Sequence, residues 1–354
     1  MKGRKPVRAL RLGLLAAVLL VVPFADHNNA HVDFLANAGA FVLLALGLNI
    51  VVGFAGLLDL GYAAFFAIGS YSYAIFASQQ FGLHVPFWIM LFVAAAIAAL
   101  FGILLGAPTL RLRGDYLAIV TLGFGEIVPQ TFLNLAQYTN GPNGIGSLDQ
   151  PSLFGRPFGF SATPYYYVVL GLIALGIVAA RNLQHSRLGR AWMAIREDEL
   201  AARHMGINAT TAKLSAFALG AAFSGVAGVA YAAKLDLVSP DQFGFNVSVL
   251  ILSMLVLGGM GNVAGVIVGS LVLSFVNSFL LPQASNIAHT AGFTYLDFTN
   301  YRFMLYGVIL VGMMLLRPAG LLPSAKRRAE LEAALTDPAL AAHEQTEYEG
   351  AHAR

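Results

Sequence analysis

The sequence predicts an all-α integral membrane protein with about ten transmembrane helices. Charged residues make up 11% of the 354 residues and apolar residues 58%, whereas a soluble domain carries roughly a quarter of its residues as Asp, Glu, Lys or Arg. Two long runs, Phe87 to Pro108 and Val247 to Leu281, contain no charge at all. A soluble chain could not bury so much apolar surface, so lipid must surround much of this one.

Apolar stretches of about twenty residues mark the individual spans. We expect them at about 10–25, 32–52, 57–77, 86–106, 116–135, 164–181, 211–233, 246–260, 262–281 and 301–316. They form two groups of five on either side of an outer loop at 136–163. An odd number of spans in each group raises the hypothesis of two inverted five-helix halves, an arrangement common in transporters, although the halves share little sequence.

The distribution of basic residues orients these spans, because basic loops stay on the cytoplasmic side of a membrane. With a cytoplasmic N-terminus, 18 of the 21 Lys and Arg residues fall on the cytoplasmic side. The other three are Arg156, Lys234 and Arg302. Both the N- and the C-terminus are therefore predicted to be cytoplasmic in a multi-pass protein.

Charge divides the chain into a basic cytoplasmic arm at 1–9, a transmembrane domain at 10–323 and a polar cytoplasmic tail at 324–354. We expect the tail to be disordered, because it is too polar to bury a core of its own. The first apolar run has a second interpretation. A basic start before it and Asn28-Asn29-Ala30 after it also suit a cleavable secretory signal.

The composition argues against enzymatic and metal chemistry. The chain has no cysteine, which excludes disulfides, thiolate metal sites and cysteine nucleophiles. Its eight His residues are scattered, and the predicted spans contain no cluster of His, Asp or Ser nucleophiles. We expect no metal site, no bound cofactor, no catalytic residue and no nucleic-acid partner, with membrane lipid as the surroundings.

The most basic inner loop, at 182–210, contains a predicted amphipathic helix. Helix-forming residues run from Arg190 to Met205, and Gly206 suits a left-handed C-terminal cap. Asn208 suits the N-cap of the next helix. The apolar positions that recur at helical spacing are Trp192, Ile195, Ala202 and Met205.

An amphipathic helix of this kind either lies on the lipid surface or docks into a groove of a partner protein. The consecutive acids Glu197, Asp198 and Glu199 suit an anionic lipid surface poorly. The pattern therefore favours docking.

The loop resembles the coupling loop of ATP-binding-cassette (ABC) importer permeases. The family pattern is Glu-Ala-Ala, three further residues and Gly, and the stretch from Leu200 to Gly206 reads Leu-Ala-Ala-Arg-His-Met-Gly. Leu200 stands in the position of the usual Glu, and the acid Glu199 is adjacent. The resemblance implies contact with a cytosolic ATPase through Gly189, Arg190, Trp192, Ile195, Arg196, Glu197, Asp198, Glu199, Ala201, Ala202 and Gly206.

Five further segments resemble the LivM-type permease of the branched-chain amino acid transporters. They are 48–53 with 56–58, 110–128, 141–145, 256–261 and 317–323, and they keep the family's order over roughly residues 35–323. The resemblance implies a subunit that imports Leu, Ile and Val across the bacterial inner membrane by alternating access. Urea and short-amide permeases share these motifs, so that substrate class stays open.

The resemblance also implies partners. They are two cytosolic ABC ATPase subunits, a second, LivH-type permease subunit and a periplasmic amino-acid-binding protein. The chain lacks a Gly-x4-Gly-Lys-Ser/Thr phosphate-binding motif, so ATP and Mg²⁺ are expected to be used by the separate ATPase subunits. This chain is then a transport subunit and not an enzyme.

Glycines interrupt two apolar regions of the sequence. The candidates for the substrate pathway in these regions are Asn49, Gly53, Gly56, Asp59, Gly258, Gly259 and Gly261. Broken helices at membrane depth line cavities or are buried in protein, and their ends suit substrate carboxylate or ammonium groups. Close packing between helices is the alternative role for the glycines.

Glu126 is an acid well inside the predicted span 116–135. A membrane-embedded ionisable residue is a functional candidate by default. It could order the substrate pathway, meet the substrate ammonium or pair with a neighbouring chain. An ion-coupled secondary amino acid transporter would also need such a group at mid-membrane, but one residue gives that alternative little support.

Overall fold

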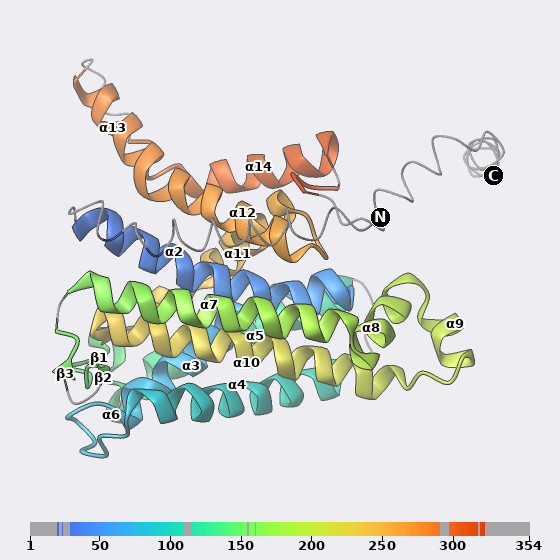
Figure 1. Ribbon diagram of the computed structural model, residues 1–354, viewed down its shortest axis with the longest axis horizontal. Coiled ribbons are helices and arrows are strands. Elements are labelled where there is room, and N and C mark those ends of the chain that lie inside the picture. Colours follow the sequence, from blue (N-terminus) through green and yellow to red (C-terminus); the bar gives the residue numbers. More distant parts are fainter. Residues whose placement is uncertain are drawn as a thin grey trace.

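The computed structural model describes residues 20, 23, 29–109, 115–153, 156–159, 161–290, 297–317 and 319–322. These residues form a bundle of helices (Figure 1). The longer helices are α2 (Asn29–Leu48), α3 (Ala63–Phe76), α4 (Phe87–Thr109), α5 (Asp115–Asn134), α7 (Ala162–His185), α8 (Arg187–Glu197), α10 (Ala209–Leu235), α11 (Phe245–Gly258), α12 (Val263–Phe275), α13 (Leu281–Thr290) and α14 (Arg302–Leu316). The π-helix η1 (Asn49–Phe54) continues α2, and the π-helix η4 (Val276–Leu280) joins α12 to α13. The short elements are α6 (Ala136–Thr139), η2 (Gly141–Asn143), β1 (Ile145–Gly146), β2 (Ser152–Leu153), β3 (Arg156–Pro157), α9 (Glu199–His204), β4 (Leu237–Val238) and η3 (Pro240–Phe243).

Seven of the described helical segments are long and apolar enough to cross a membrane. They are Asn29–Phe54, Phe87–Thr109, Tyr116–Asn134, Ala162–His185, Ala209–Leu235, Pro240–Gly258 and Val263–Thr290. The helices α3 and α14 are apolar but shorter. Each of these segments overlaps one predicted span, which confirms the helical membrane class. The basic arm, the tail and almost all of the predicted span 10–25 lie outside the described residues, and the hypothesis of inverted halves stays a prediction.

The helix α3 is shorter than its predicted span, 57–77, because it begins only at Ala63. Gly56, with a φ of 71°, turns the chain out of η1 ahead of this non-helical stretch. Two backbone N–H groups near the start of α3 donate to side chains of neighbouring helices. The Leu60 N–H donates to the Thr121 Oγ1 at 3.1 Å, and the Ala63 N–H donates to the Ser248 Oγ at 3.0 Å. Side chains of α5 and α11 thus satisfy donors that a longer helix would satisfy itself.

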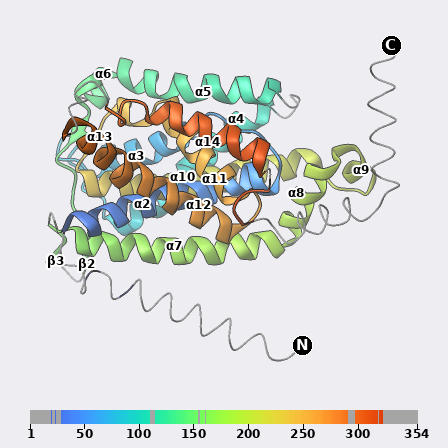
Figure 2. The same ribbon diagram turned by 90° about the horizontal axis from the view of Figure 1, so that it is seen from above.

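The central helix of the bundle is α10, which packs against α4, α3 and α2 (Figure 2). Its backbone comes close to theirs at glycines. A methyl group on Gly225 would stand 2.7 Å from the Ala94 carbonyl oxygen, and one on Gly228 would stand 2.7 Å from the Phe66 carbonyl oxygen. The Ser70 hydroxyl donates to the Gly228 carbonyl at 3.1 Å. Small residues permit this close approach, which is how helices associate in lipid.

The two ends of the bundle are built differently. At one end the outer loop 136–163 contributes β1, which pairs antiparallel with β4, and the hairpin of β2 and β3. At the other end α8 and α9 project beyond the bundle (Figure 1). The loop 136–163 and the loop 182–210 therefore lie at opposite ends of the helices, as predicted.

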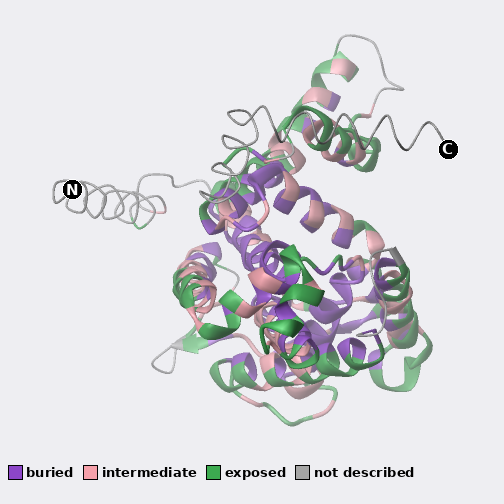
Figure 3. Cartoon of the chain, turned by 90° about the vertical axis from the view of Figure 1, so that its right-hand side faces the viewer, coloured by how far each residue is buried: buried purple, intermediate pink, exposed green. Residues whose placement is uncertain are grey.

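Buried residues occupy the middle of the bundle and exposed residues its periphery (Figure 3). The peripheral faces are apolar as well. Phe92 on α4 is 79% exposed, Leu175 on α7 is 68% exposed and Leu316 on α14 is 84% exposed. Apolar surface of this extent on several apolar helices fits a lipid environment.

Candidate functional site

The loop 182–210 folds into two short helices, so the prediction of one continuous helix from Arg190 to Met205 is wrong. Asp198 breaks it, with φ −152° and ψ 109°. Its carboxylate accepts hydrogen bonds from the backbone N–H groups of Leu200 at 2.8 Å and Ala201 at 3.0 Å, and so caps α9. As an N-cap, Asp198 satisfies two backbone N–H groups that would otherwise have no partner, which favours a break at this residue over a continuous helix.

The predicted caps at the end of the loop are confirmed. Gly206 adopts a φ of 84°, the left-handed conformation that glycine takes without steric cost. The Asn208 side chain accepts from the Thr211 N–H at 3.2 Å and begins α10. The Ser186 hydroxyl caps α8 in the same way, by accepting from the Gly189 N–H at 3.2 Å.

The apolar side of α8 faces this chain. Trp192 is fully buried, and its Nε1 donates to the Ala212 carbonyl at 2.8 Å and to the Ser215 Oγ at 3.1 Å, both on α10. Ile195 and Ala202 are also buried. The prediction of one apolar ridge facing a partner is therefore wrong for these three residues.

The apolar residues that α9 exposes are different. Met205, just after α9, is 83% exposed, and Leu200 is 55% exposed. Periodicity identifies an apolar helix face, but it does not say whether that face packs on the chain's own core or on another protein.

Glu199 attaches α9 to α10. Its carboxylate lies 2.8 Å from the Nζ of Lys213, which is only 6% exposed, and 2.5 Å from the Nη2 of Arg203. Burial opposes ionisation of Glu199, but the hydrogen bond and charge of Lys213, helped by Arg203, outweigh it and lower the pKa of Glu199 below its usual value. The acid next to the position of the usual Glu thus makes its ion pairs within this chain.

Arg196 turns from α8 toward two broken helix ends. Its Nη1 donates a hydrogen bond to the carbonyl of Gly53 in η1. The Cγ of Arg196 would stand 2.6 Å from a methyl group on Gly56, so only glycine leaves it room. The Asn49 Oδ1 accepts from the Gly261 N–H at 2.8 Å, which joins η1 to the turn between α11 and α12.

We call Asn49, Gly53, Gly56, Arg196 and Gly261 the helix-break junction. Four of its members were predicted as pathway candidates and the fifth as a coupling residue, and the structure brings all five together. A π-helix such as η1 leaves backbone groups misaligned and often marks a functional position. The junction is where the projecting loop meets the ends of two long helices.

The other glycine candidates serve close packing. A methyl group on Gly258 would collide with the Gly265 carbonyl oxygen, and one on Gly259, at φ 111°, would stand 2.7 Å from the Leu322 carbonyl oxygen. The Leu322 N–H donates to the Gly258 carbonyl at 3.1 Å. For Gly258 and Gly259 close packing accounts for the geometry.

Asp59 lies in the stretch before α3 and is 1% exposed. Its Oδ1 accepts from the Gly61 N–H at 2.9 Å, and no described residue forms a hydrogen bond with its Oδ2. Asp59 is not among the residues of the helix-break junction. Its role in a substrate pathway stays a prediction.

Glu126 lies on the exposed side of α5. Gln130 and Asn134 follow it at intervals of four residues and are exposed as well. We call these three residues the α5 polar stripe. The sequence showed Glu126, but the stripe was missed, although spacing of four within a predicted span could have revealed it. A carboxyl group on this face is costly in hydrocarbon unless water or protein covers it.

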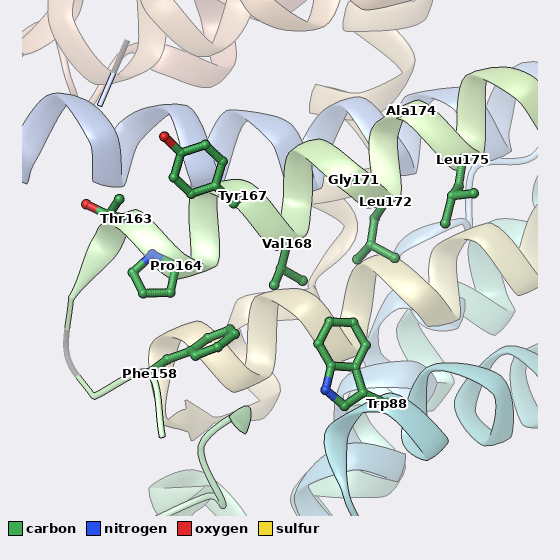
Figure 4. Close-up of a pocket in the computed structure, with 10 residues that line it drawn as sticks. All are labelled: Trp88, Phe158, Thr163, Pro164, Tyr167, Val168, Gly171, Leu172, Ala174 and Leu175. Carbon is green, nitrogen blue, oxygen red and sulfur yellow. The ribbon is translucent and has the colours of Figure 1, made fainter. Parts of the chain in front are cut away.

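A groove of about 780 Å³ lies between α7, the start of α4 and Phe158 of the outer loop (Figure 4). Its walls include Trp88, Phe158, Tyr167, Leu172 and Leu175, and it has no charged side chain. It offers nothing to neutralise the ammonium and carboxylate of an amino acid, which a substrate site must do.

A bundle of helices of membrane-spanning length whose broken ends meet a projecting helical loop fits a multi-pass transport subunit. The family described as the branched-chain amino acid transport system permease component matches residues 31–314, and the chain belongs to this family. The resemblance noted in the sequence is thereby confirmed.

Three relatives illustrate the family's range. The chain is similar to the high-affinity branched-chain amino acid transport system permease protein LivM of Salmonella typhimurium, with 39% identity over 346 residues that cover 91% of this chain and 77% of the relative. Permease protein LivH of the same kind of system in Escherichia coli is 28% identical over 301 residues, covering 80% and 91%. The ribose import permease protein RbsC of Escherichia coli is 27% identical over 281 residues, covering 76% and 83%. No solved structure matches the chain.

The Glu199–Lys213 pair yields a stability prediction. Lys213→Met should lower the free energy of unfolding of the loop by about 1–2 kcal/mol, between the values typical of exposed and of buried ion pairs. Because the pKa of Glu199 lies below its usual 4.5, this contribution is present above that pH and is lost as the pH falls through the lower pKa.

Fluorescence of Trp192 measures the effect at neutral pH. The chain has two Trp residues, so a Trp88→Phe background leaves Trp192 as the reporter. Arg203→Met is the control, because it removes the more exposed partner of Glu199 and should cost only about 0.3–0.5 kcal/mol. Equal effects of the two substitutions would contradict the assignment.

Proposed function

We propose that this chain is a permease subunit of an ABC importer that carries branched-chain amino acids across the bacterial inner membrane. The observation that supports this most is the 39% identity to LivM over 91% of the chain. Two cytosolic ATPase subunits, which use ATP and Mg²⁺, a LivH-type permease and a periplasmic amino-acid-binding protein complete the importer. This chain binds no cofactor of its own.

The exposed apolar residues at α9 are the contact with the ATPase. Leu200 on α9 and Met205 just after it are exposed, and α9 lies at the end of the bundle farthest from the outer loop. Exposed apolar anchors with a charged surround suit a groove in a partner protein. The buried residues Trp192, Ile195 and Ala202 hold the loop in shape for this contact.

The assembled importer in proteoliposomes tests this function. Uptake of labelled leucine should require internal ATP and the loaded binding protein, and it should survive a protonophore. Met205→Asp should abolish ATPase co-purification and uptake, because it places a charge on the apolar contact. Leu83→Asp is the control, since Leu83 is also an exposed apolar residue and its neighbour His84 bonds to Asp149 in the outer loop, far from α9. Normal co-purification and uptake of Met205→Asp would exclude this contact.

The proposed topology has ten spans, both termini in the cytoplasm and the loop 136–163 outside. Its support is the position of 18 of the 21 basic residues and the placement of the two large loops at opposite ends of the bundle. Single cysteines at Asn143 and Arg203, both exposed, test it in this cysteine-free chain. A membrane-impermeant thiol reagent should label Asn143→Cys in intact cells and Arg203→Cys only in inverted vesicles. The reverse pattern would overturn the topology.

The α5 polar stripe is the proposed wall of the substrate pathway. A carboxyl group and two amides in a row offer hydrogen bonds to water and to an ammonium group where lipid offers none. We expect Glu126→Gln to lower leucine uptake severalfold at equal membrane abundance, because the negative charge is lost and the shape is kept. Uptake per transporter is compared with that of Gln79→Glu, a change of the same size outside the spans. Wild-type uptake by Glu126→Gln would leave Glu126 as a tolerated polar residue.

A further inference from the structure

The carbonyl that Arg196 binds lies in the last turn of a helix. The C-terminal carbonyls of a helix have no partner within it and carry a partial negative charge, so a cation there is favourable. In η1 the carbonyls of Ile50, Val51 and Val52 accept from Ala55, Leu57 and Gly56. The carbonyl of Gly53 is the next in line, and the Arg196 guanidinium takes it.

The surroundings of this bond leave no space for a side chain at Gly53. A methyl group on Gly53 would collide with the Asn49 side chain and stand 2.8 Å from the Gly261 nitrogen. Gly261 also receives a weak hydrogen bond from the Gln184 side chain, at 3.5 Å, near the end of α7. The junction therefore connects η1, the α11–α12 turn and α7 at one place, with Arg196 as the contribution of α8.

The helix α8 is anchored at its start and its middle, and its last turn leads into α9. Ser186 caps its start, Trp192 fastens it to α10, and Asp198 separates it from α9. Arg196 stands one turn beyond Trp192, at the end of α8 that continues into α9. A displacement of α9 therefore reaches the end of α8 at Arg196 first.

We infer that Arg196 is a positioning residue that transmits movement of the ATPase-facing loop to the broken ends of α2–η1 and α11–α12. A force on α9 shifts the Arg196 guanidinium, and the Gly53 carbonyl and the Asn49–Gly261 bond follow it. This inference rests on the proposed function, because it takes the loop as the ATPase contact. It assigns the exposed side chain of Arg196 to a hydrogen bond within this chain, whereas the sequence resemblance implied contact with the ATPase.

The test uses the complete importer in proteoliposomes and measures leucine taken up per ATP hydrolysed. Arg196→Met should keep ATPase co-purification and stimulation by the loaded binding protein, while uptake per ATP falls at least about tenfold, the scale of a lost charged hydrogen bond. Arg196→Lys keeps a cationic donor and should recover part of the loss. Arg187→Met, at an exposed position on the same helix, removes the same charge as Arg196→Met. It is the control and should behave as wild type.

A second measurement reports on the junction itself. Spin labels at Leu188→Cys on α8 and Leu58→Cys after η1, both exposed, give the distance between the two elements. With Arg196 present the distance distribution should stay narrow with and without ATP, and in Arg196→Met it should broaden on addition of ATP.

The outcomes separate the inference from the proposed function. Unchanged uptake per ATP in Arg196→Met, or an unchanged distance distribution, would overturn the role of Arg196. Loss of ATPase co-purification in Arg196→Met would also overturn it, because Arg196 would then act at the partner's surface. Normal co-purification of Met205→Asp would instead remove the ATPase contact on which both ideas depend.

Discussion

The close approach of α10 to its neighbours is the constraint on which the rest of the structure depends. Lipid tails are as apolar as the side chains, so moving an apolar side chain from lipid into a helix interface yields little free energy. Helices in lipid therefore associate through close backbone packing and interhelical hydrogen bonds. Gly225 and Gly228 provide the proximity, and the hydroxyl of Ser70 provides one of the bonds. The first turns of α10 also hold the Ala212 carbonyl, which accepts from Trp192, and Lys213, which pairs with Glu199. The projecting loop is therefore fastened to the central helix of the bundle, and this anchor holds it although it projects beyond the other helices.

At the helix-break junction, beside this closely packed region, the regular hydrogen bonding of two long helices is interrupted. Breaks in membrane helices are tolerated only where other groups satisfy the freed backbone. Here the Asn49 amide oxygen and the Arg196 guanidinium do so for Gly261 and Gly53. Each bond joins elements that are far apart in the sequence, so a small shift of α8 changes the partners of two long helices together. Such a bond can transmit displacement because the elements that it joins pack closely at the glycines around it.

The sequence predicted most of the helices, because an uncharged apolar stretch of membrane length seldom forms anything but a transmembrane helix. It also predicted the caps at Gly206 and Asn208, which follow from local backbone chemistry. It did not predict that Asp198 would divide the loop helix, since Asp is tolerated in a first turn or as a cap and the choice depends on tertiary contacts. Nor could periodicity show that Trp192 faces α10. The meeting of Asn49, Arg196 and Gly261 is set by packing between segments more than sixty residues apart, and one sequence contains no direct signal for such contacts.

The α5 polar stripe bears on how complete this chain is as a transporter. Most outward faces of the described helices are apolar and need only lipid, but Glu126, Gln130 and Asn134 need water or protein. Within the described residues α5 packs on one side only, chiefly against α3 and η3. Its other side therefore requires either an aqueous channel or a second polypeptide. A pathway that lies between two permease subunits would supply both, since each subunit would then contribute one polar wall and the rest of its surface would stay in lipid. Both α2, which leads into the junction, and α5, which carries the stripe, contact the non-helical stretch before α3. Gly47 of α2 lies against the Tyr62 hydroxyl, and Thr121 of α5 accepts from the Leu60 N–H. Contacts within this chain therefore connect the junction with the α5 polar stripe.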